Sequence, residues 1–335
     1  MAKLLKLIQN EWMKLWRKKA TWIMLIMLIV IVIGMAGLNK WISSKYGSTE
    51  DSTGGTVTIE NAEGKDAPKL SWKEQEKAIV AENDKMLKED GLSKDEKEDL
   101  IEQKSISEYR LKNDIAPESD MSTESFVLNS SGMLSLVTMF VVVIAAGIVA
   151  IEFSEGTIKM LLTRPVKRWK ILTSKFATVL LFGIVMAAVT WITSTIIGFM
   201  LFDTSGESYL KWNGSEVVEQ SIWLRSLYLY LISSVNIFVT ATFAFMIGSV
   251  FRSNALAIGI SMFLWFMGST IVVFLSKYEI VKYLFFTYTD LTQFVNGYVI
   301  VEGTTMALAL AVLSVYVIIF MVISYIVFTK RDITA

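Results

Sequence analysis

Six long stretches of this chain contain no charged residue, and they constrain its fold more than any other feature. Each is near or above the ~20 residues that an α-helix needs to cross ~30 Å of hydrocarbon. They are Ala20–Leu38, Met133–Ile151, Phe176–Phe202, Ser226–Phe251, Ser253–Ser276 and Gly303–Thr329. The sequence therefore predicts an all-α, polytopic membrane protein with six transmembrane helices.

The first stretch also has the length of a secretory signal peptide. About twenty residues precede it, however, and they have the pattern of an amphipathic helix rather than of a short basic leader. No A-x-A-like cleavage site follows the stretch cleanly. We therefore expect an uncleaved first span.

The charged residues are divided unevenly between the two sides of the predicted membrane. An even number of spans puts both termini on one side, and that side carries 15 basic and 4 acidic residues. The other side carries the remaining 17 basic and 28 acidic residues, so the net charge of zero hides +11 facing −11. Because short loops rich in Lys and Arg stay in the cytoplasm, we expect both termini to be cytoplasmic.

The N-terminal segment, residues 1–19, has the pattern of a helix that lies on a membrane surface. Apolar residues recur there at three- and four-residue spacing, and basic residues flank them. Trp12 and Trp16 suit the headgroup level, with Lys14 and Arg17 beside them. We predict an amphipathic elbow helix, which anchors the chain at the interface and is also able to serve as a docking surface for a cytoplasmic partner.

The largest polar segment is residues 39–132, which we predict to be extracytoplasmic. Ser71 to Glu74 and Ser93 to Glu96 each have the spacing of a capping box, and Gly91 is a suitable helix stop between them. These signals predict a helical hairpin. The segment is either a spacer or a cap that senses or gates a substrate.

Three further segments lie outside the spans. Residues 203–225 read as a short, acidic-leaning outer loop, and residues 330–335 as a cytoplasmic tail. Residues 277–302 contain an aromatic run that is too short to cross a membrane. We predict an interfacial or re-entrant segment there, which is either an aromatic belt or a substrate exit gate.

The composition removes most catalytic chemistry from this chain. Without Cys or His there is no thiol nucleophile, no Ser-His-Asp triad and no usual zinc or haem site. The spans lack the ionisable residues that proton- or ion-coupled transporters use. No phosphate-binding G-x-x-x-x-G-K-[ST] motif is present either. We predict a non-enzymatic chain without catalytic residues, metal or cofactor, and any ATP and Mg²⁺ would bind a partner.

The most informative segment is the cytoplasmic loop between the second and third spans, residues 152–175. We expect a short helix from about Gly156 to Thr163, with Glu155 complementing the positive end of its dipole. Pro165 forces a turn after it. A second, basic amphipathic helix, Val166–Ser174, then leads into the third span. The simplest alternative is a loop that is basic only because it is cytoplasmic.

This loop resembles the cytoplasmic loop of ABC-2-type transporter permeases. The shared pattern is E-x-x-E-G-T-x-x-x-L-L-T-x-P-x-x-R-x-x-I-L-x-x-K, and it lies between the second and third of six spans, where that family carries it. The amphipathic elbow helix and the segment before span six are similar too. The long first outer segment departs from many relatives. The matching loop residues are Glu152, Glu155, Gly156, Thr157, Leu161, Leu162, Thr163, Arg164, Pro165 and Arg168.

The resemblance implies that these residues form a coupling helix and turn that dock on an ATPase subunit. It implies two ATP-binding cassette ATPase chains, a second permease copy or paralogue, and export across a bacterial cytoplasmic membrane. Membrane lipid is the other expected partner, and nucleic acid is not expected. Two other readings stay open: a non-transporting immunity or sensor protein whose outer hairpin binds a ligand, and a membrane enzyme that acts on lipid.

Overall fold

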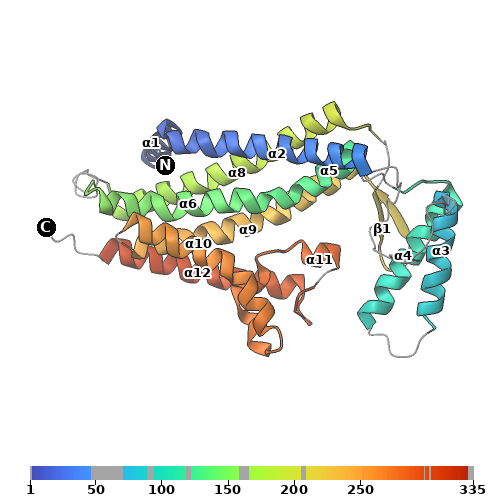
Figure 1. Cartoon of the computed structure of the whole chain (residues 1–335). Helices are drawn as coiled ribbons and strands as arrows, with labels where there is room; N and C mark the ends of the chain where they lie inside the picture. Colours follow the sequence, from blue (N-terminus) through green and yellow to red (C-terminus); the bar gives the residue numbers. More distant parts are fainter. Residues whose placement is uncertain are drawn as a thin grey trace. The chain divides into compact units, whose positions relative to one another are not determined.

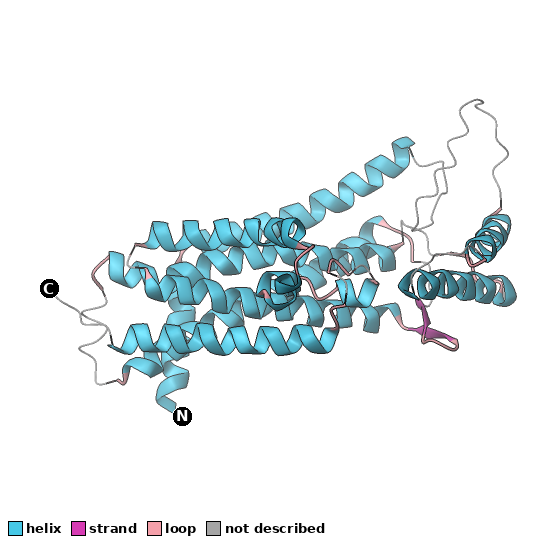
Figure 2. Cartoon of the chain, turned by 90° about the horizontal axis from the view of Figure 1, so that it is seen from below, coloured by secondary structure: helices cyan, strands magenta, loops and turns pink. Residues whose placement is uncertain are grey.

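The computed structural model describes the chain except for residues 1, 47–70, 89–93, 118–121, 158–165, 205–208, 252, 298, 302 and 331–335. Within the described residues, six helical segments are long and apolar enough to cross a membrane. They are α2 (Lys19–Tyr46), α5 (Thr123–Asn129) continued through η1 (Ser130–Met133) into α6 (Leu134–Ser154), α8 (Arg168–Leu201), α9 (Ile222–Val250), α10 (Asn254–Leu275) and α12 (Met306–Lys330). Helix dominates the chain (Figure 2). The prediction of a multi-pass, six-span helical membrane protein is confirmed at this level.

The described residues form two compact units, and α2, α8 and α9 contribute residues to both. The first unit is Met1–Gly34, Asn129–Ser194 and Tyr228–Ala335, and the second is Met35–Leu128 and Thr195–Leu227.

In the first unit, α6, α9, α10 and α12 lie side by side with part of α8 (Figure 1). The core follows α6, where Val137, Val141, Ala145 and Val149 are fully buried at helical spacing. Small residues allow the helices to approach closely. An added Cβ at Gly248 of α9 would lie 2.2 Å from the carbonyl oxygen of Ala146 in α6. Only glycine fits this crossing.

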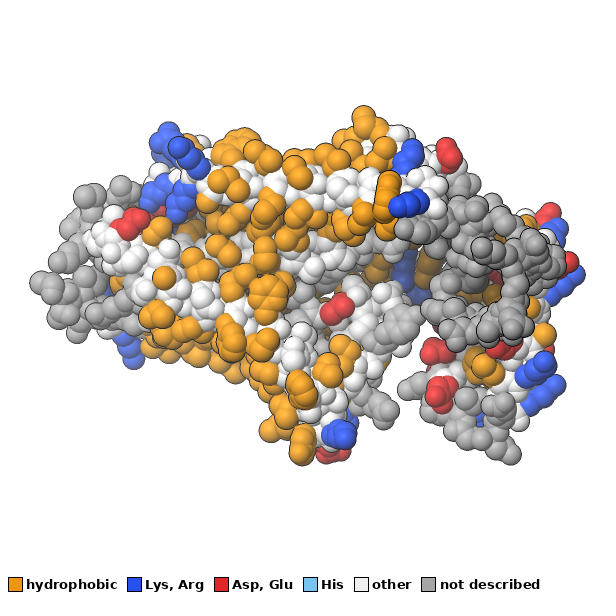
Figure 3. Space-filling view, in the orientation of Figure 1, with side chains coloured by type: hydrophobic (Ala, Val, Ile, Leu, Met, Phe, Trp, Pro, Cys, Tyr) orange, Lys and Arg blue, Asp and Glu red, His pale blue; other side chains and the backbone are white. Residues whose placement is uncertain are grey.

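The outer flanks of the helices are apolar, as a bilayer requires. Large hydrophobic side chains are exposed along α2, α8, α10 and α12. Figure 3 shows this apolar surface, with Lys and Arg gathered at the end of the bundle near α1 (Ala2–Arg17).

Between α10 and α12 the chain forms η2 (Glu279–Tyr283), η3 (Phe285–Tyr288) and the short α11 (Gln293–Asn296). Phe285 is 5% exposed, and its ring centroid lies 5.1 Å from that of Phe243 and 5.5 Å from that of Phe320. The Tyr288 ring is also buried. The belt interpretation is therefore wrong for Phe285 and Tyr288, because their rings pack into the helix bundle, although Tyr283 is exposed.

The second unit contains α3 (Trp72–Met86) and α4 (Lys94–Asn113), which pack against each other. Ion pairs join them between Lys73 and Asp114, just past α4, and between Asp84 and Lys104, at 2.6 Å each. The pair nearer the start of α3 lies at the end of α4, and the pair nearer the end of α3 lies in the middle of α4, so the two helices run antiparallel. At the start of α3, the Ser71 backbone N–H donates to the Glu74 carboxylate at 2.8 Å. The second predicted capping box lies partly outside the described residues.

Residues 203–225, which we predict to be a short outer loop, contain a β-hairpin. Strands β1 (Tyr209–Trp212) and β2 (Val217–Gln220) form an antiparallel pair in which Tyr209 faces Gln220. Asn213 closes the turn by accepting hydrogen bonds from the backbone N–H groups of Ser215 and Glu216. Tyr209 and Trp212 at the ends of β1 favour strand over coil.

Candidate functional site

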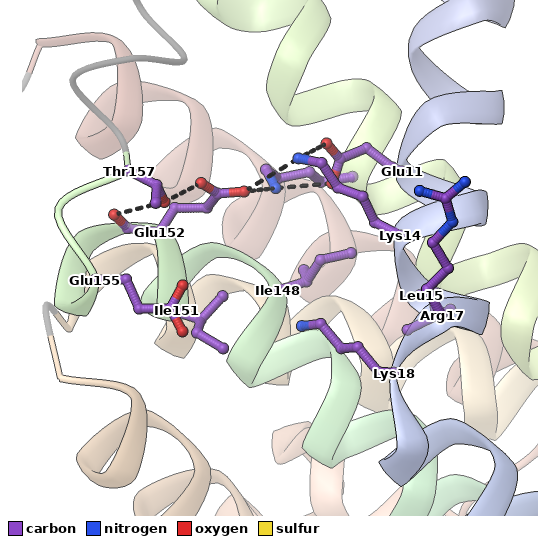
Figure 4. Close-up of a pocket in the computed structure, with 11 residues that line it drawn as sticks. Glu11, Lys14, Leu15, Arg17, Lys18, Ile148, Ile151, Glu152, Glu155 and Thr157 are labelled. Carbon is purple, nitrogen blue, oxygen red and sulfur yellow. Dashed lines mark hydrogen bonds and ion pairs between the residues drawn. The ribbon is translucent and has the colours of Figure 1, made fainter.

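A buried network of ion pairs joins three helices at one end of the first unit. Lys175 of α8 is 1% exposed, and its Nζ lies 2.8 Å from Glu11 Oε2 in α1 and 2.9 Å from Glu152 Oε1 in α6. Lys14 of α1 completes the network, with its Nζ 3.1 Å from Glu11 Oε1 and 3.7 Å from Glu152 Oε1 (Figure 4). Two cations thus balance two carboxylates.

The sequence places these charges on buried faces. Lys175 follows the buried Ile171 and Leu172 by about one turn of α8, and Glu11 precedes the buried Leu15 by one turn of α1. Charges in such positions are tolerated only when they are paired and hydrogen-bonded. The network therefore fixes α1, α6 and α8 to one another.

The segment that follows Glu152 differs from the predicted helix start. α6 ends at Ser154, and Gly156 takes the left-handed conformation with a φ of 72°. The Gly156 N–H donates to the Phe153 carbonyl at 3.3 Å, as at a helix C-terminus. Glu155 lies at the C-terminal end of α6. Most of the helix that we predict from about Gly156 to Thr163 lies outside the described residues. The Thr157 hydroxyl turns back and donates to the Glu152 carboxylate.

The predicted second helix of the loop is also not separate. α8 runs without a break from Arg168 to Leu201. Most of the predicted helix Val166–Ser174 therefore forms the first two turns of α8. Thr173 Oγ1 lies 2.6 Å from the Tyr325 hydroxyl of α12. The Arg168 guanidinium donates to the Thr329 carbonyl at 3.1 Å. The last turns of α12 therefore lie at the same end of the unit as α1 and the network.

A pocket of about 500 Å³ opens beside the network. Figure 4 shows the side chains of Lys14 and Lys18 reaching from the N-terminal segment toward the side where Glu152 and Glu155 lie, whereas the Arg17 guanidinium is turned away from them. Its apolar lining comes from Leu15, Ile148 and Ile151.

The pocket brings together residues from both predicted sites. Glu152, Glu155 and Thr157 of the loop line it with Lys14 and Arg17 of the N-terminal segment. Trp12 and Trp16 lie outside it, with ring centroids 5.5 Å apart, and Trp16 packs on Trp22 at 5.5 Å. The other loop residues predicted at this site, Leu161, Leu162, Thr163, Arg164 and Pro165, lie outside the described residues.

Two members of the network, Glu11 and Lys175, were missed as site residues by reasoning from the sequence. The available signal was the position of each charge on an apolar helical face. Glu11 is the acid of a basic segment and sits three residues after Ile8 and four before Leu15. Lys175 directly precedes the apolar run of the third span.

The site offers charge pairing and an apolar wall rather than reactive groups. Among the described residues, no three acidic side chains gather in a way that could hold a metal ion. What the arrangement provides is a direct bond from the end of α6 to α8 and α1 through Lys175.

The fold and this site define a multi-pass α-helical membrane protein whose N-terminal helix is bonded to the bundle. The sequence profile described as "Protein of unknown function (DUF2705)" matches residues 98–334. The chain belongs to this family. It is 36% identical to the uncharacterized protein YhcI of Bacillus subtilis (strain 168), over 98% of this chain and 99% of that protein. It is 31% identical to the uncharacterized membrane protein YdbK of the same organism, over 59% of this chain and 78% of that protein.

These findings correct the assignment to the ABC-2-type permeases. The profile that matches is that of a family of unknown function, and both relatives are uncharacterized. The loop pattern covers 24 residues and specifies only 12 of them. A short pattern of this kind does not establish a family.

Proposed function

We propose that this chain is a non-catalytic membrane subunit of an ATP-driven exporter, and that separate ATPase chains move it. The observation that carries the proposal is the Lys175 network. It bonds the two helices that flank the loop, α6 and α8, to the N-terminal helix. A partner that pulls on this loop would therefore displace three helices together.

Charge and topology support the same proposal. α1, the loop ends of α6 and α8, and the end of α12 gather at one end of the first unit. The excess of basic residues in these segments favours a cytoplasmic position for that end, where an ATPase would reach it. We propose that Glu152 acts within the network and that Thr157 to Arg168 supply the docking surface. A second copy, or a similar chain, would form the other half of the path.

Sidedness has a direct test, because the chain has no Cys. Single cysteines are introduced as Lys88→Cys, after α3, and Lys167→Cys, before α8. In whole cells, a membrane-impermeant maleimide should label Lys88→Cys and leave Lys167→Cys unlabelled until the cells are opened. The reverse pattern would show that the site faces outward and would end the proposal.

The partner is tested by affinity purification of the full chain from membranes. We expect an ATPase chain to co-purify, and Leu162→Asp in the loop to abolish this. Val218→Asp, an exposed apolar-to-acid change in β2, is the matched control and should retain the ATPase. If no ATPase co-purifies, or Leu162→Asp retains it, the proposal fails and the sensor reading becomes the stronger one.

A further inference from the structure

The pocket beside the network contains charges that the network does not use. Glu11, Glu152, Lys14 and Lys175 bond to one another. Within the described part of the chain, Arg17, Lys18 and Glu155 also line the pocket, but none of them forms an ion pair. All three are exposed, so a ligand can reach them.

These remaining charges have opposite signs and stand on opposite sides of the pocket. Figure 4 shows the Lys18 ammonium pointing across the pocket toward Ile151 and the Glu155 carboxylate. Arg17 also lines the pocket, but its guanidinium points away from the Lys18 ammonium in Figure 4. A complementary ligand therefore carries an anionic group for the α1 side and a cationic group for Glu155.

The pocket also lies at the depth where apolar surface gives way to charge. In α6 the uncharged run ends at Ile151, and Glu152 follows it directly. Ile148 and Ile151 are half-buried lining residues. On the next turns of α2, Trp22, Ile23 and Ile26 are exposed, which provides an apolar surface for hydrocarbon chains. A ligand at this depth has a polar head and an apolar tail.

We infer that the pocket binds the headgroup of an aminophospholipid, in which a phosphodiester lies close to a primary ammonium. Lys18 contacts the phosphodiester, Glu155 accepts hydrogen bonds from the ammonium, and Ile148 and Ile151 contact the start of the acyl chains. The volume of about 500 Å³ is within the range of roughly 300–1,000 Å³ typical of small-ligand sites.

The geometry discriminates between headgroups. Phosphatidylglycerol has no cation, so it would leave Glu155 unpaired beside the phosphodiester. Phosphatidylcholine carries a quaternary ammonium without N–H groups, so it cannot donate to the carboxylate. A hydrogen bond to a charged group is worth about 1.5–3 kcal/mol, or roughly tenfold or more in affinity. Phosphatidylethanolamine should therefore bind at least about tenfold more tightly than either.

The test is a lipid titration of the purified full chain in detergent, followed by native mass spectrometry. Phosphatidylethanolamine, phosphatidylcholine and phosphatidylglycerol with identical acyl chains are compared, together with free glycerophosphoethanolamine. We expect Glu155→Gln to weaken the binding of phosphatidylethanolamine about tenfold, to the affinity of phosphatidylglycerol. Lys18→Gln should weaken the binding of all three lipids about tenfold. Lys19→Gln and Glu279→Gln, exposed residues of the same charge types outside the pocket, should change nothing.

Three outcomes would overturn the inference. They are equal retention of the three lipids, tightest binding of phosphatidylglycerol, and an unchanged preference in Glu155→Gln. Binding of glycerophosphoethanolamine as tight as that of the lipid would overturn the membrane source of the ligand. The titration contains neither nucleotide nor ATPase, so its result is independent of the export proposal.

Discussion

Replacing Lys175 by Met tests how much the buried network stabilises the bundle. The change removes the cation that lies 2.8 and 2.9 Å from two carboxylates and leaves Glu11 and Glu152 facing each other in a buried site. At an effective dielectric constant of about 20, each contact is worth roughly 6 kcal/mol of Coulomb attraction. Burial of Lys175 offsets much of this attraction, because the ammonium loses its water.

The net cost follows from what remains after the substitution. Removal of one partner from a buried ion pair costs about 3–5 kcal/mol, mainly because the other charge is left unpaired. Lys14 still contacts both carboxylates, but its side chain is 47% exposed and water screens it. We therefore expect Lys175→Met to lower the free energy of unfolding by about 3 kcal/mol, near the lower end of this range.

The assay is thermal stability of the purified chain in detergent, followed by size-exclusion chromatography after heating. Lys175→Met should lower the midpoint temperature by more than about 5 °C. Lys170→Met is the matched control in the same helix. The Lys170 ammonium lies over the Trp169 ring at 5.5 Å, a weaker contact, so this change should have a small effect.

A compensated variant separates the charge effect from misfolding. Lys175→Met combined with Glu11→Leu and Glu152→Leu replaces every buried charge by an apolar side chain, a change that is often neutral or stabilising. We expect it to recover most of the lost midpoint temperature. The reasoning is refuted if the single variant keeps the wild-type midpoint, or if the triple variant is as unstable as the single one.

Three further predictions use the same purified chain. Gly248→Ala should lower the thermal midpoint, since overpacking costs about 1–3 kcal/mol, whereas Gly259→Ala has open space and should not; equal midpoints would contradict the close crossing. Phe285→Ala should lower the thermal midpoint, because loss of this buried ring costs about 3–5 kcal/mol of stability. Phe274→Ala should lower the midpoint much less, because the Phe274 side chain is 79% exposed. Hydrogen bonds from the Ser71 backbone N–H and hydroxyl lower the pKa of Glu74 below 4.5, so this carboxylate stabilises α3 above that pH and the contribution is lost as the pH falls through the lowered pKa. Amide exchange in the first turn of α3 should be slower than in Glu74→Gln at neutral pH, and the difference should vanish in acid; a difference that persists in acid would count against the cap.

The helices of the bundle were predictable because the bilayer imposes one strong rule on sequence. A span without charge must be helical and about 20 residues long, and the six uncharged stretches lie on the six observed helices. The helix ends were less predictable. α2 continues past Leu38 to Tyr46, and α8 begins eight residues before Phe176, because a helix does not stop where its hydropathy changes.

The site was only partly predictable, since its central contact joins residues far apart in the sequence. Glu152, Glu155 and Thr157 were found through the loop pattern, and Lys14 and Arg17 through amphipathic spacing. Lys175 is the last position of the loop pattern, but it was not predicted as a site residue, because nothing local indicates that a lysine beside a span will be buried. Its pairing with Glu11 depends on how α1 packs, which one-dimensional patterns do not contain.

The bond between Glu11 and Lys175 also sets an order of events during biosynthesis. The two residues are 164 positions apart, so at about 5–20 residues per second α1 waits roughly 8–33 seconds before its partner is made. Until then, Glu11 has no buried cation to meet, and α1 is held only by its apolar face and Lys14. The helix of the third span therefore supplies the cation that fixes α1 to the bundle. Nascent chains truncated before Lys175 should leave α1 accessible to protease.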